Sequence, residues 1–336
     1  MIKNLNRNTQ LNSFLKSFFG ASPFSYQAIT SDASFRQYFR VTTPVSSYIL
    51  MDSPADLIDN APFIGLRQDF ELAGLAVPKL VSSDLTLGFI LLSDLGSIHL
   101  ADCLEQPSRF TDYQTILDLL PNVAAIPKSK WMKPYDAGFI RLEINIFKEW
   151  LLEKWLGLIV PIQYETQWNN LTELLVENML KQPQVTMHRD FHSRNIMKTG
   201  SNWALIDFQD AVQGPVCYDA VSLLKDCYFK LPQQEFESLL VYSFEVMKQS
   251  NLLEGMPFET YRTYFELTGL QRHLKAAGIF CRLLLRDNKA GYITSILPTL
   301  AYVQAVLKQH QEFQGLATWF DDEIIPAIEQ KIELLR

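Results

Sequence analysis

Polar side chains in one short region have the types and spacing needed to move a phosphoryl group. MHRDFHSRNIM, residues 187–197, places Asp190 two positions after His188, and Asn195 five positions after Asp190. A nearby stretch, WALIDF, carries Asp207 near the end of a hydrophobic run. A carboxylate outside a metal shell can accept the proton of an attacking hydroxyl, whereas an amide oxygen and a second carboxylate suit Mg²⁺. The pattern assigns Asp190 as the base and Asn195 with Asp207 as metal ligands.

A β-hairpin is expected to bring these residues together. NIMK and WALIDF flank the turn TGSN, so that Lys198 should face Trp203. Counting back along both arms places Asp207 opposite Arg194, or opposite Asn195 if one arm has a one-residue bulge. Side chains at facing positions lie roughly 5 to 8 Å apart, which is close enough to share one divalent ion.

The remaining sequence predicts a small antiparallel sheet followed by a larger helical region. Residues 4–19 have helical spacing, and a second helix is expected over residues 57–74. Five β-rich runs are predicted: SYQAIT, RQYFRVTT, SSYILMD, KLVSSDL and GFILLSD. Further helices are expected after Asp136 and over residues 165–181, 233–250, 259–286 and 318–335. These elements indicate an α+β fold with an N-lobe over residues 1–95 and a C-lobe over residues 96–336.

Composition limits the classes of partner. The formal net charge is −7 with a pI near 5.3, and no block of like charge occurs, which argues against nucleic-acid binding. The chain lacks about 18 consecutive apolar residues and a secretion signal, so we expect no membrane span and a cytoplasmic location. Free, mostly buried thiols are expected for Cys103, Cys217, Cys227 and Cys281, which show no C-x-x-C spacing.

The catalytic set resembles that of protein kinases, with clear departures. His188, Asp190 and Asn195 match the H-R-D and Asn positions, and the I-D-F around Asp207 matches the D-F-G region. Gln209 stands where the Gly would be, and no A-P-E segment or long activation loop follows. The chain is instead similar to the aminoglycoside-phosphotransferase-like small-molecule kinases, which implies their two-lobed, protein-kinase-like fold.

Within that superfamily, the chain most resembles the bacterial N-acetylmuramate/N-acetylglucosamine anomeric kinases. The resemblance runs from about residue 31 to 295, through DASFRQYFRV, YILMDSP, FILLSDLG, IDFQDAVQGPVCYDAVSLLKD and QRHLKAAGIFCRLLLRDNKAGYI. It implies transfer of phosphate from ATP, with Mg²⁺, to the anomeric hydroxyl of amino sugars released in cell-wall recycling. The second Asp of the superfamily matches Asp219, whose implied role is to support the catalytic loop; His188 is expected to help hold that loop.

The expected nucleotide-binding lobe, residues 1–95, departs from the kinase pattern. It has no G-x-G-x-x-G loop, and Met51 stands about where the third strand of a kinase carries a Lys. Several residues could contact the nucleotide instead. For some of them, a place on an exposed strand face or at an ordinary strand end is an equally good interpretation. The residues expected to contact the phosphates or the adenine are Ser34, Arg36, Arg40, Asp94 and Leu95.

Acceptor-site candidates lie in the C-lobe. Charged or imidazole side chains expected to contact the sugar are Arg141, Glu143, His192 and Arg194. Surface charge on an amphipathic helix is the competing interpretation of the first two. Five cations between Arg272 and Lys289 share one stripe of a helix. A solvated face is the ordinary interpretation of that stripe, and contact with an anion such as the lactyl carboxylate of N-acetylmuramate is the alternative.

Two other functions stay open from sequence. The same fold can phosphorylate an aminoglycoside or another small alcohol or amine, although the basic stripe disfavours a polycationic acceptor. A nucleotide-binding regulator without turnover would explain the missing strand-three Lys, whereas the Asp190, Asn195 and Asp207 set argues against it. The sequence does not decide the preferred amino sugar, the anomer or the oligomeric state.

Overall fold

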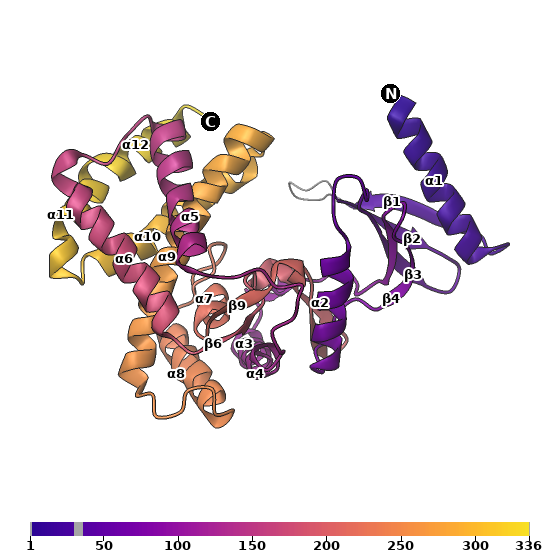
Figure 1. The fold of residues 1–336 in the computed structure, drawn as a ribbon, viewed down its shortest axis with the longest axis horizontal. Coiled ribbons are helices and arrows are strands. Elements are labelled where there is room, and N and C mark those ends of the chain that lie inside the picture. Colours follow the sequence, from indigo (N-terminus) through magenta and orange to yellow (C-terminus); the bar gives the residue numbers. More distant parts are fainter. Residues whose placement is uncertain (1, 30–35, 336) are drawn as a thin grey trace. The chain divides into compact units, whose positions relative to one another are not determined.

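A computed structural model describes residues 2–29 and 36–335, so Ser34 lies outside the described residues. The chain divides into two units (Figure 1). The first unit comprises Met1–His99 with Ile196–Gln209, and the second comprises Leu100–Asn195 with Asp210–Arg336. The first unit thus takes a segment from the middle of the chain, and the division into lobes at residues 95 and 96 stays a prediction.

An antiparallel sheet forms the centre of the first unit. In the described residues its strand order is β1-β2-β3-β5-β4, which confirms that the β-rich runs pair in antiparallel fashion. Helix α1 (Ile2–Phe19) lies along this sheet (Figure 1) and buries Leu11 and Leu15 against Val41, Leu50 and Phe89. The strands are β1 (Ser25–Ile29), β2 (Gln37–Thr42), β3 (Ser47–Asp52), β4 (Leu80–Asp84) and β5 (Phe89–Ser93).

Helix α2 (Ala61–Leu72) follows β3 and anchors the hairpin from the middle of the chain. It begins later than the predicted residue 57, with a proline in its first turn, where the missing N–H costs no hydrogen bond. Its aromatic residues Phe63 and Phe70 contact Phe208, with ring centroids 5.3 and 5.5 Å away. These contacts hold the chain directly after Asp207.

The hairpin consists of β7 (Ile196–Thr199) and β8 (Asn202–Leu205). Lys198 pairs with Trp203, which confirms the predicted register. Gly200 has φ of 62°, a left-handed conformation that glycine adopts without strain in this turn. The ladder ends at the Ile196 and Leu205 pair, so Asn195 directly precedes it and Asp207 follows it by two residues.

The long helix α9 (Phe258–Asp287) is central to the second unit, with α5 (Ala137–Ile146), α6 (Glu165–Lys181), α7 (Tyr218–Leu224) and α10 (Ile296–Leu307) packed around it (Figure 1). Its buried residues join one large apolar cluster. Strands β6 (Gln184–Met187) and β9 (Val212–Pro215) pair beside these helices. The other helices are α3 (Arg109–Leu117), α4 (Leu120–Ala124), α8 (Gln233–Gln249), α11 (Gln314–Trp319) and α12 (Ile325–Glu333).

Close packing of α5 on α9 depends on one glycine. Asp136 caps α5 as predicted, since its side chain accepts the backbone N–H of Phe139 at 2.9 Å. After Ile146 the helix continues as a π-helical segment, Phe147–Leu156. A Cβ on Gly278 of α9 would lie 2.5 Å from the carbonyl oxygen of Ile146. Glycine therefore lets α9 approach the backbone at the end of α5. These two helices carry the charged side chains described below.

One stretch of the described residues, Ala290–Leu307, is long and apolar enough to cross a membrane by length and composition. Its helical part is α10, whose Ile296, Leu300 and Val303 are fully buried in the apolar cluster of the second unit. The four cysteines are free and buried, as expected.

Candidate active site

The candidate catalytic loop, residues 188–195, connects β6 to β7, and its first residues are held by Asp219. This carboxylate lies in the first turn of α7 and accepts the backbone N–H groups of His188 at 2.6 Å and Arg189 at 2.9 Å. Both His188 and Asp219 are buried. Burial raises the pKa of Asp219 to about 7, while the two backbone N–H groups lower it. Asp219 therefore restrains the backbone immediately before Asp190.

A second carboxylate, Asp226, holds the far end of the loop. It accepts the backbone N–H of Ser193 and that of Tyr228, both at 3.0 Å, and it is 2% exposed. The sequence analysis missed this residue, because its only signal is its place seven positions after Asp219 in a stretch that reads as a helix. The loop is thus bound at both ends by buried carboxylates that follow β9.

Asp190 is half-buried between these two attachments. Burial raises its pKa, but the positive charges of Lys275 and Arg189 lower it by a larger amount. The pKa of Asp190 therefore lies below its usual range. His192 adds little charge at neutral pH because burial lowers its own pKa. Asp190 is therefore ionised at neutral pH, the state in which a carboxylate can accept a hydrogen bond and then a proton from a hydroxyl.

Asn195 is oriented by the loop itself. Its Nδ2 donates to the backbone carbonyl of Asp190 at 3.1 Å, and the backbone N–H of His192 reaches the same carbonyl at 3.0 Å. With the amide nitrogen directed to the loop, the amide oxygen is the end of the side chain suited to a cation. No group of three His, Cys, Asp or Glu able to hold a metal occurs among the described residues. An amide oxygen suits a hard cation better than it suits zinc, which prefers nitrogen and sulfur ligands.

Asp207, in the first unit, adopts an uncommon backbone conformation. Its φ is 65°, and Arg189 in the catalytic loop has φ of 76°. The other non-glycine residues with positive φ in the described chain are Asn251 and Asn288; Asn tolerates this region, whereas Arg rarely adopts it. Gln209 donates to the carboxylate of Asp207. Such conformations persist where surrounding contacts enforce them, and they concentrate at functional sites.

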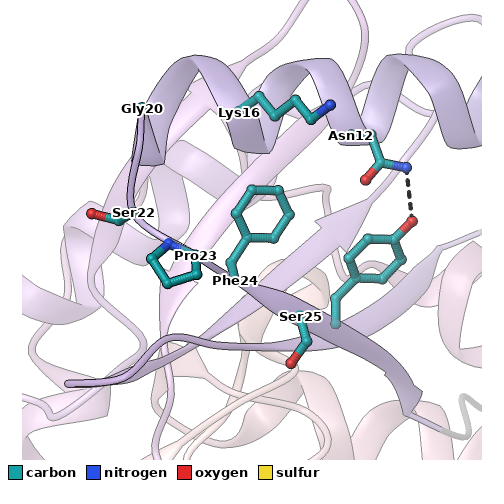
Figure 2. A pocket seen from close by; sticks show the side chains of 8 residues that line it. Asn12, Lys16, Gly20, Ser22, Pro23, Phe24 and Ser25 are labelled. Carbon is teal, nitrogen blue, oxygen red and sulfur yellow. Dashed lines mark hydrogen bonds between the residues drawn. The ribbon is translucent and has the colours of Figure 1, made fainter.

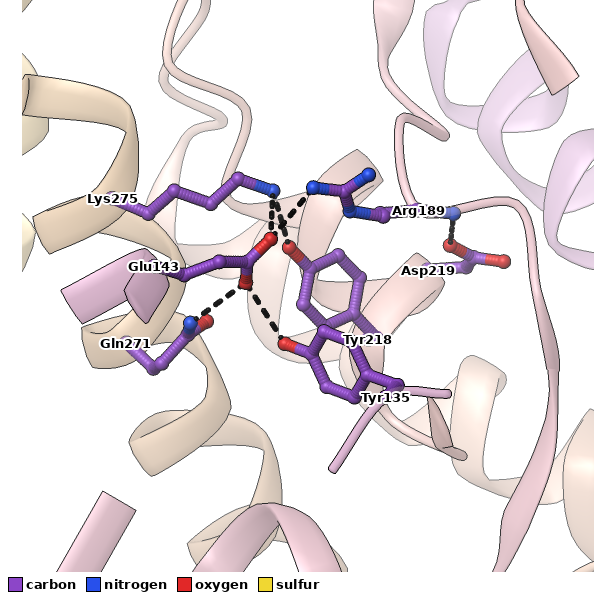
Figure 3. A network of polar contacts seen from close by, with 7 residues as sticks. All are labelled: Tyr135, Glu143, Arg189, Tyr218, Asp219, Gln271 and Lys275. Atoms are coloured by element: carbon purple, nitrogen blue, oxygen red, sulfur yellow. Dashed lines mark hydrogen bonds and ion pairs between the residues drawn. The ribbon is translucent and has the colours of Figure 1, made fainter. Parts of the chain in front are cut away.

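Glu143 of α5 lies at the centre of a buried polar network (Figure 3). One carboxylate oxygen accepts from Arg189 at 2.8 Å and pairs with Lys275 at 3.0 Å. The other accepts from the Tyr135 hydroxyl and the Gln271 amide, each at 3.0 Å. Burial raises the pKa of Glu143, but the charges of Lys275 and Arg189 lower it below its usual value. Glu143 is 1% exposed.

The basic stripe of α9 is divided between core and surface. Arg272 and Lys275 are buried, at 6% and 7% exposure, and Lys275 also donates to the Tyr218 hydroxyl at 3.1 Å. Arg286 instead forms an exposed ion pair with its neighbour Asp287. The interpretation of the stripe as a solvated face is therefore wrong for Arg272 and Lys275. Helical spacing predicted the shared face correctly, but only tertiary packing brings the Glu143 carboxylate to Lys275 and the Cys227 sulfur to Arg272.

The other acceptor-site candidates occupy two different environments. Arg141 forms an exposed bidentate ion pair with Glu173, at 3.0 and 2.6 Å. Arg194 is exposed at the end of the catalytic loop and stacks on Tyr228, 3.5 Å from the ring centroid. His192 also contacts Tyr228, edge to face, at 5.7 Å. His192 and Arg194 therefore share an aromatic support next to Asp190.

On the nucleotide side, β3 offers no cation in place of a lysine. Met51 is fully buried and pairs with Tyr38 of β2. Arg40 is bound to Asp94 by two hydrogen bonds, at 2.8 and 3.2 Å, and also donates to the Gly96 carbonyl. Leu95 stands between these last two residues and is partly exposed. Arg40 and Asp94 thus satisfy each other.

Arg36 lies in a different setting, directly before β2. Its guanidinium is 5.9 Å from the ring centroid of Phe63, the residue that stacks on Phe208. Burial raises the pKa of Tyr38 to about 12, Arg36 lowers it and Asp207 raises it. Both charges therefore act at the Tyr38 hydroxyl, which brings Arg36 and the metal-ligand candidate Asp207 to the same part of the first unit.

The first unit also has an open surface pocket of about 480 Å³ between α1 and β1 (Figure 2). Pro23 and Phe24 are among the residues that line it, and Asn12 donates to the Tyr26 hydroxyl. Of the described residues predicted to bind ATP, none lines it.

Comparison with known proteins decides the family. Residues 25–247 match the phosphotransferase enzyme family, APH. This chain belongs to that family. A Pseudomonas putida protein named N-acetylmuramate/N-acetylglucosamine kinase is 33% identical over 292 residues, 87% of this chain and 86% of that protein. A Neisseria meningitidis serogroup B protein of the same name is 32% identical over 317 residues, 93% of this chain and 94% of that protein.

Solved structures with the same fold include several small-molecule kinases. A choline/ethanolamine kinase family protein from Mesorhizobium loti aligns with a TM-score of 0.63 at 13% identity, covering 96% of this chain and 99% of that one. The ADP-bound aminoglycoside phosphotransferase APH(2'')-Ib aligns with a TM-score of 0.56 at 13% identity, covering 87% and 97%. The phosphotransferase described here therefore has the predicted α+β, two-lobed, protein-kinase-like fold.

Proposed function

We propose that this phosphotransferase transfers the γ-phosphoryl group of ATP to the anomeric hydroxyl of N-acetylmuramate and N-acetylglucosamine, in the recycling of cell-wall sugars. The observation that carries this proposal is the alignment with two proteins of that name over 86% and 94% of their lengths. A second support is the ionised Asp190, held in a loop bound at both ends. The four free, buried cysteines suit a reducing cytoplasm, where ATP is abundant.

Asp190 acts as the base in this proposal. Its carboxylate accepts a hydrogen bond from the anomeric hydroxyl and orients the oxygen for in-line attack on the γ-phosphorus. The new oxygen–phosphorus bond forms as the bond to the β–γ bridging oxygen breaks, and ADP leaves. The hydroxyl proton passes to Asp190 and then to solvent. The products are a sugar 1-phosphate and ADP.

Asn195 and Asp207 are the proposed ligands of Mg²⁺. Their amide and carboxylate oxygens are the donors that this hard cation prefers. When bound, Mg²⁺ supplies charge neutralisation at the phosphate oxygens. The loop contributes by turning the Asn195 amide nitrogen to the Asp190 carbonyl.

Arg36 is the proposed cation at the phosphates, in place of the strand-three Lys. Arg40 is already bound by Asp94 and the Gly96 carbonyl, whereas Arg36 acts with Asp207 on Tyr38. Backbone groups near Asp94 and Leu95 remain the proposed adenine contacts, and Ser34 is proposed for the phosphates.

His192 and Arg194 are the proposed contacts to the sugar, because both lie on Tyr228 at the end of the catalytic loop. Arg194 suits an acceptor that carries a carboxylate, since its planar guanidinium can bind both oxygens. An aminoglycoside is a polycation and would be repelled by the same side chain. Arg141 is proposed for the same site only as an outer contact, because Glu173 already pairs with it.

The test is a panel of N-acetylated sugars and aminoglycosides incubated with ATP and Mg²⁺, with products identified by ³¹P and ¹H NMR. We expect phosphate at C1 of N-acetylmuramate and N-acetylglucosamine, formed about 10²- to 10⁴-fold more slowly by Asp190→Asn. Phosphate at C3 or C6, or transfer to aminoglycosides alone, would contradict the proposal. Absence of transfer to every acceptor would favour the regulator without turnover.

A further inference from the structure

We propose that Glu143 is a positioning residue, which fixes Asp190 through Arg189 and makes no contact with the sugar. This inference rests on the proposed role of Asp190 as base. The residue lies on α5, which is far from the catalytic loop in the sequence, and its side chain reaches the loop inside the second unit. From the sequence, Glu143 is a candidate sugar contact, so the two roles make opposite predictions for sugar binding.

The carboxylate of Glu143 has no capacity left for a sugar hydroxyl. A carboxylate offers about four lone-pair sites. Arg189 and Lys275 occupy one oxygen, and Tyr135 with Gln271 occupy the other, all between 2.8 and 3.0 Å (Figure 3). With 1% exposure, the group meets protein atoms on every side. Its effect on the reaction therefore has to pass through those partners.

Arg189 is the partner that leads to Asp190. It directly precedes Asp190 and has φ of 76°, a conformation that a non-glycine residue keeps only when other contacts enforce it. Two contacts do so: its backbone N–H donates to Asp219, and its guanidinium donates to Glu143. Without Glu143, the guanidinium, which is 18% exposed, would lose its anion and move toward water. The peptide before Asp190 would then relax, and the carboxylate would turn with it.

Lys275 links the same network to the charge around Asp190. It pairs with Glu143 at 3.0 Å and with the Tyr218 hydroxyl at 3.1 Å. Its ammonium is thus held between α5 and α7, with Asp190 close enough to feel its charge. Glu143 therefore orders both cations that act on Asp190, one through the backbone and one through space.

The central experiment compares Glu143→Gln with Glu143→Asp and with the control Glu177→Gln. Gln keeps the size but removes the charge, Asp keeps the charge on a shorter side chain, and Glu177 forms an exposed ion pair with Lys181. We expect Glu143→Gln to lower kcat about 10²-fold, the usual effect of roughly 1 Å of misplacement, with KM for sugar and ATP within about 3-fold. Glu143→Asp should recover part of kcat, and Glu177→Gln should match wild type.

A double-mutant cycle tests the route through Arg189. If Glu143 acts through Arg189, the double variant Glu143→Gln/Arg189→Met should lose no more kcat than the worse single variant. Additive losses would contradict the route. A higher KM for the sugar, with a loss that differs between N-acetylmuramate and N-acetylglucosamine, would instead support direct sugar contact and overturn the proposal.

Hydrogen exchange gives a readout that does not depend on the acceptor. In Glu143→Gln, the backbone amides of residues 188–195 should exchange faster than in wild type, while the α8 amides should not change. Unchanged exchange in the loop would also overturn the proposal. If Glu143→Gln fails to fold, Tyr135→Phe removes one donor and keeps the charge of Glu143, so it should cost less stability and give a smaller kcat loss in the same direction. If wild type phosphorylates no sugar, the proposed function fails, and the loop exchange still tests the positioning role.

Discussion

The candidate catalytic loop of the second unit and the third strand of the first unit differ in the charged groups around them. Around the loop, the carboxylates of Asp219, Asp226 and Glu143 are buried, and each accepts hydrogen bonds from the loop. At the third strand, the position expected for a lysine is the buried Met51, and the nearby Arg40 is already paired.

The difference lies in what each region needs from its ligand. In the proposed mechanism, Asp190 must be ionised and aligned before the sugar arrives, because a misplaced base loses most of its effect. A triphosphate brings its own large negative charge, so a cation can meet it from a neighbouring strand end. We therefore expect substitutions in the loop to reduce activity more than substitutions among the proposed phosphate contacts.

The largest expected effect is at Asp190. Asp190→Asn removes the base but keeps the side chain's size, and should lower kcat by about 10²- to 10⁴-fold. ATP affinity, measured by calorimetry with Mg²⁺, should stay within about 3-fold, because the proposed nucleotide contacts are elsewhere. A variant that keeps a tenth or more of wild-type kcat would contradict the role of Asp190 as base.

The metal ligands should come next. Asp207→Asn and Asn195→Ala each remove one proposed oxygen ligand, and should lower kcat/KM for ATP about 10²-fold. The Mg²⁺ concentration needed for half-maximal rate should rise in both. The measurement is a Mg²⁺ titration at saturating sugar, with Glu177→Gln as control. An unchanged Mg²⁺ requirement in Asp207→Asn would remove that residue from the metal shell.

The two arginines sharpen the phosphate side of the comparison. Arg36→Met should raise KM for ATP about 10-fold, since a charge-assisted hydrogen bond contributes roughly 1.5–3 kcal/mol. Arg40→Met should leave KM within about 3-fold and cost at most about 1 kcal/mol of stability, because its ion pair is part-exposed at 36% and 6%. Steady-state kinetics and thermal unfolding separate the two effects. The opposite order of KM changes would assign the phosphates to Arg40.

The last prediction concerns stability and not rate: its pH dependence at Glu143. Burial raises its pKa, but Lys275 and Arg189 lower it below the usual value. A carboxyl whose folded-state pKa is lowered stabilises the fold above its unfolded pKa, and this contribution is lost as pH falls through the folded pKa. Glu143→Gln should cost about 3–5 kcal/mol near neutral pH. Urea unfolding should show that difference shrinking below the usual pKa of Glu, and a constant difference would contradict it.

Much of the fold and the central motif follows from local sequence patterns. The α6 helix matches its predicted range, Asp136 caps α5, and Lys198 faces Trp203 as counted from the turn. These features depend on residues close together in the chain, whose period of 3.6 or 2 and turn chemistry are visible in the sequence. The quoted motifs likewise identified the family, because each is an uninterrupted stretch of sequence.

The roles of single charged residues depended on packing. Nothing near Arg40 in the chain indicates Asp94 as its partner, and nothing in RLEINIF indicates that Glu143 meets Arg189 and Lys275. The charge and helical face of Lys275 were readable, whereas its burial was not. Sequence by itself therefore determined most of the elements, the family and the candidate catalytic motif around Asp190. Only the tertiary structure decided which charges meet, because such pairs join residues that are distant in the chain.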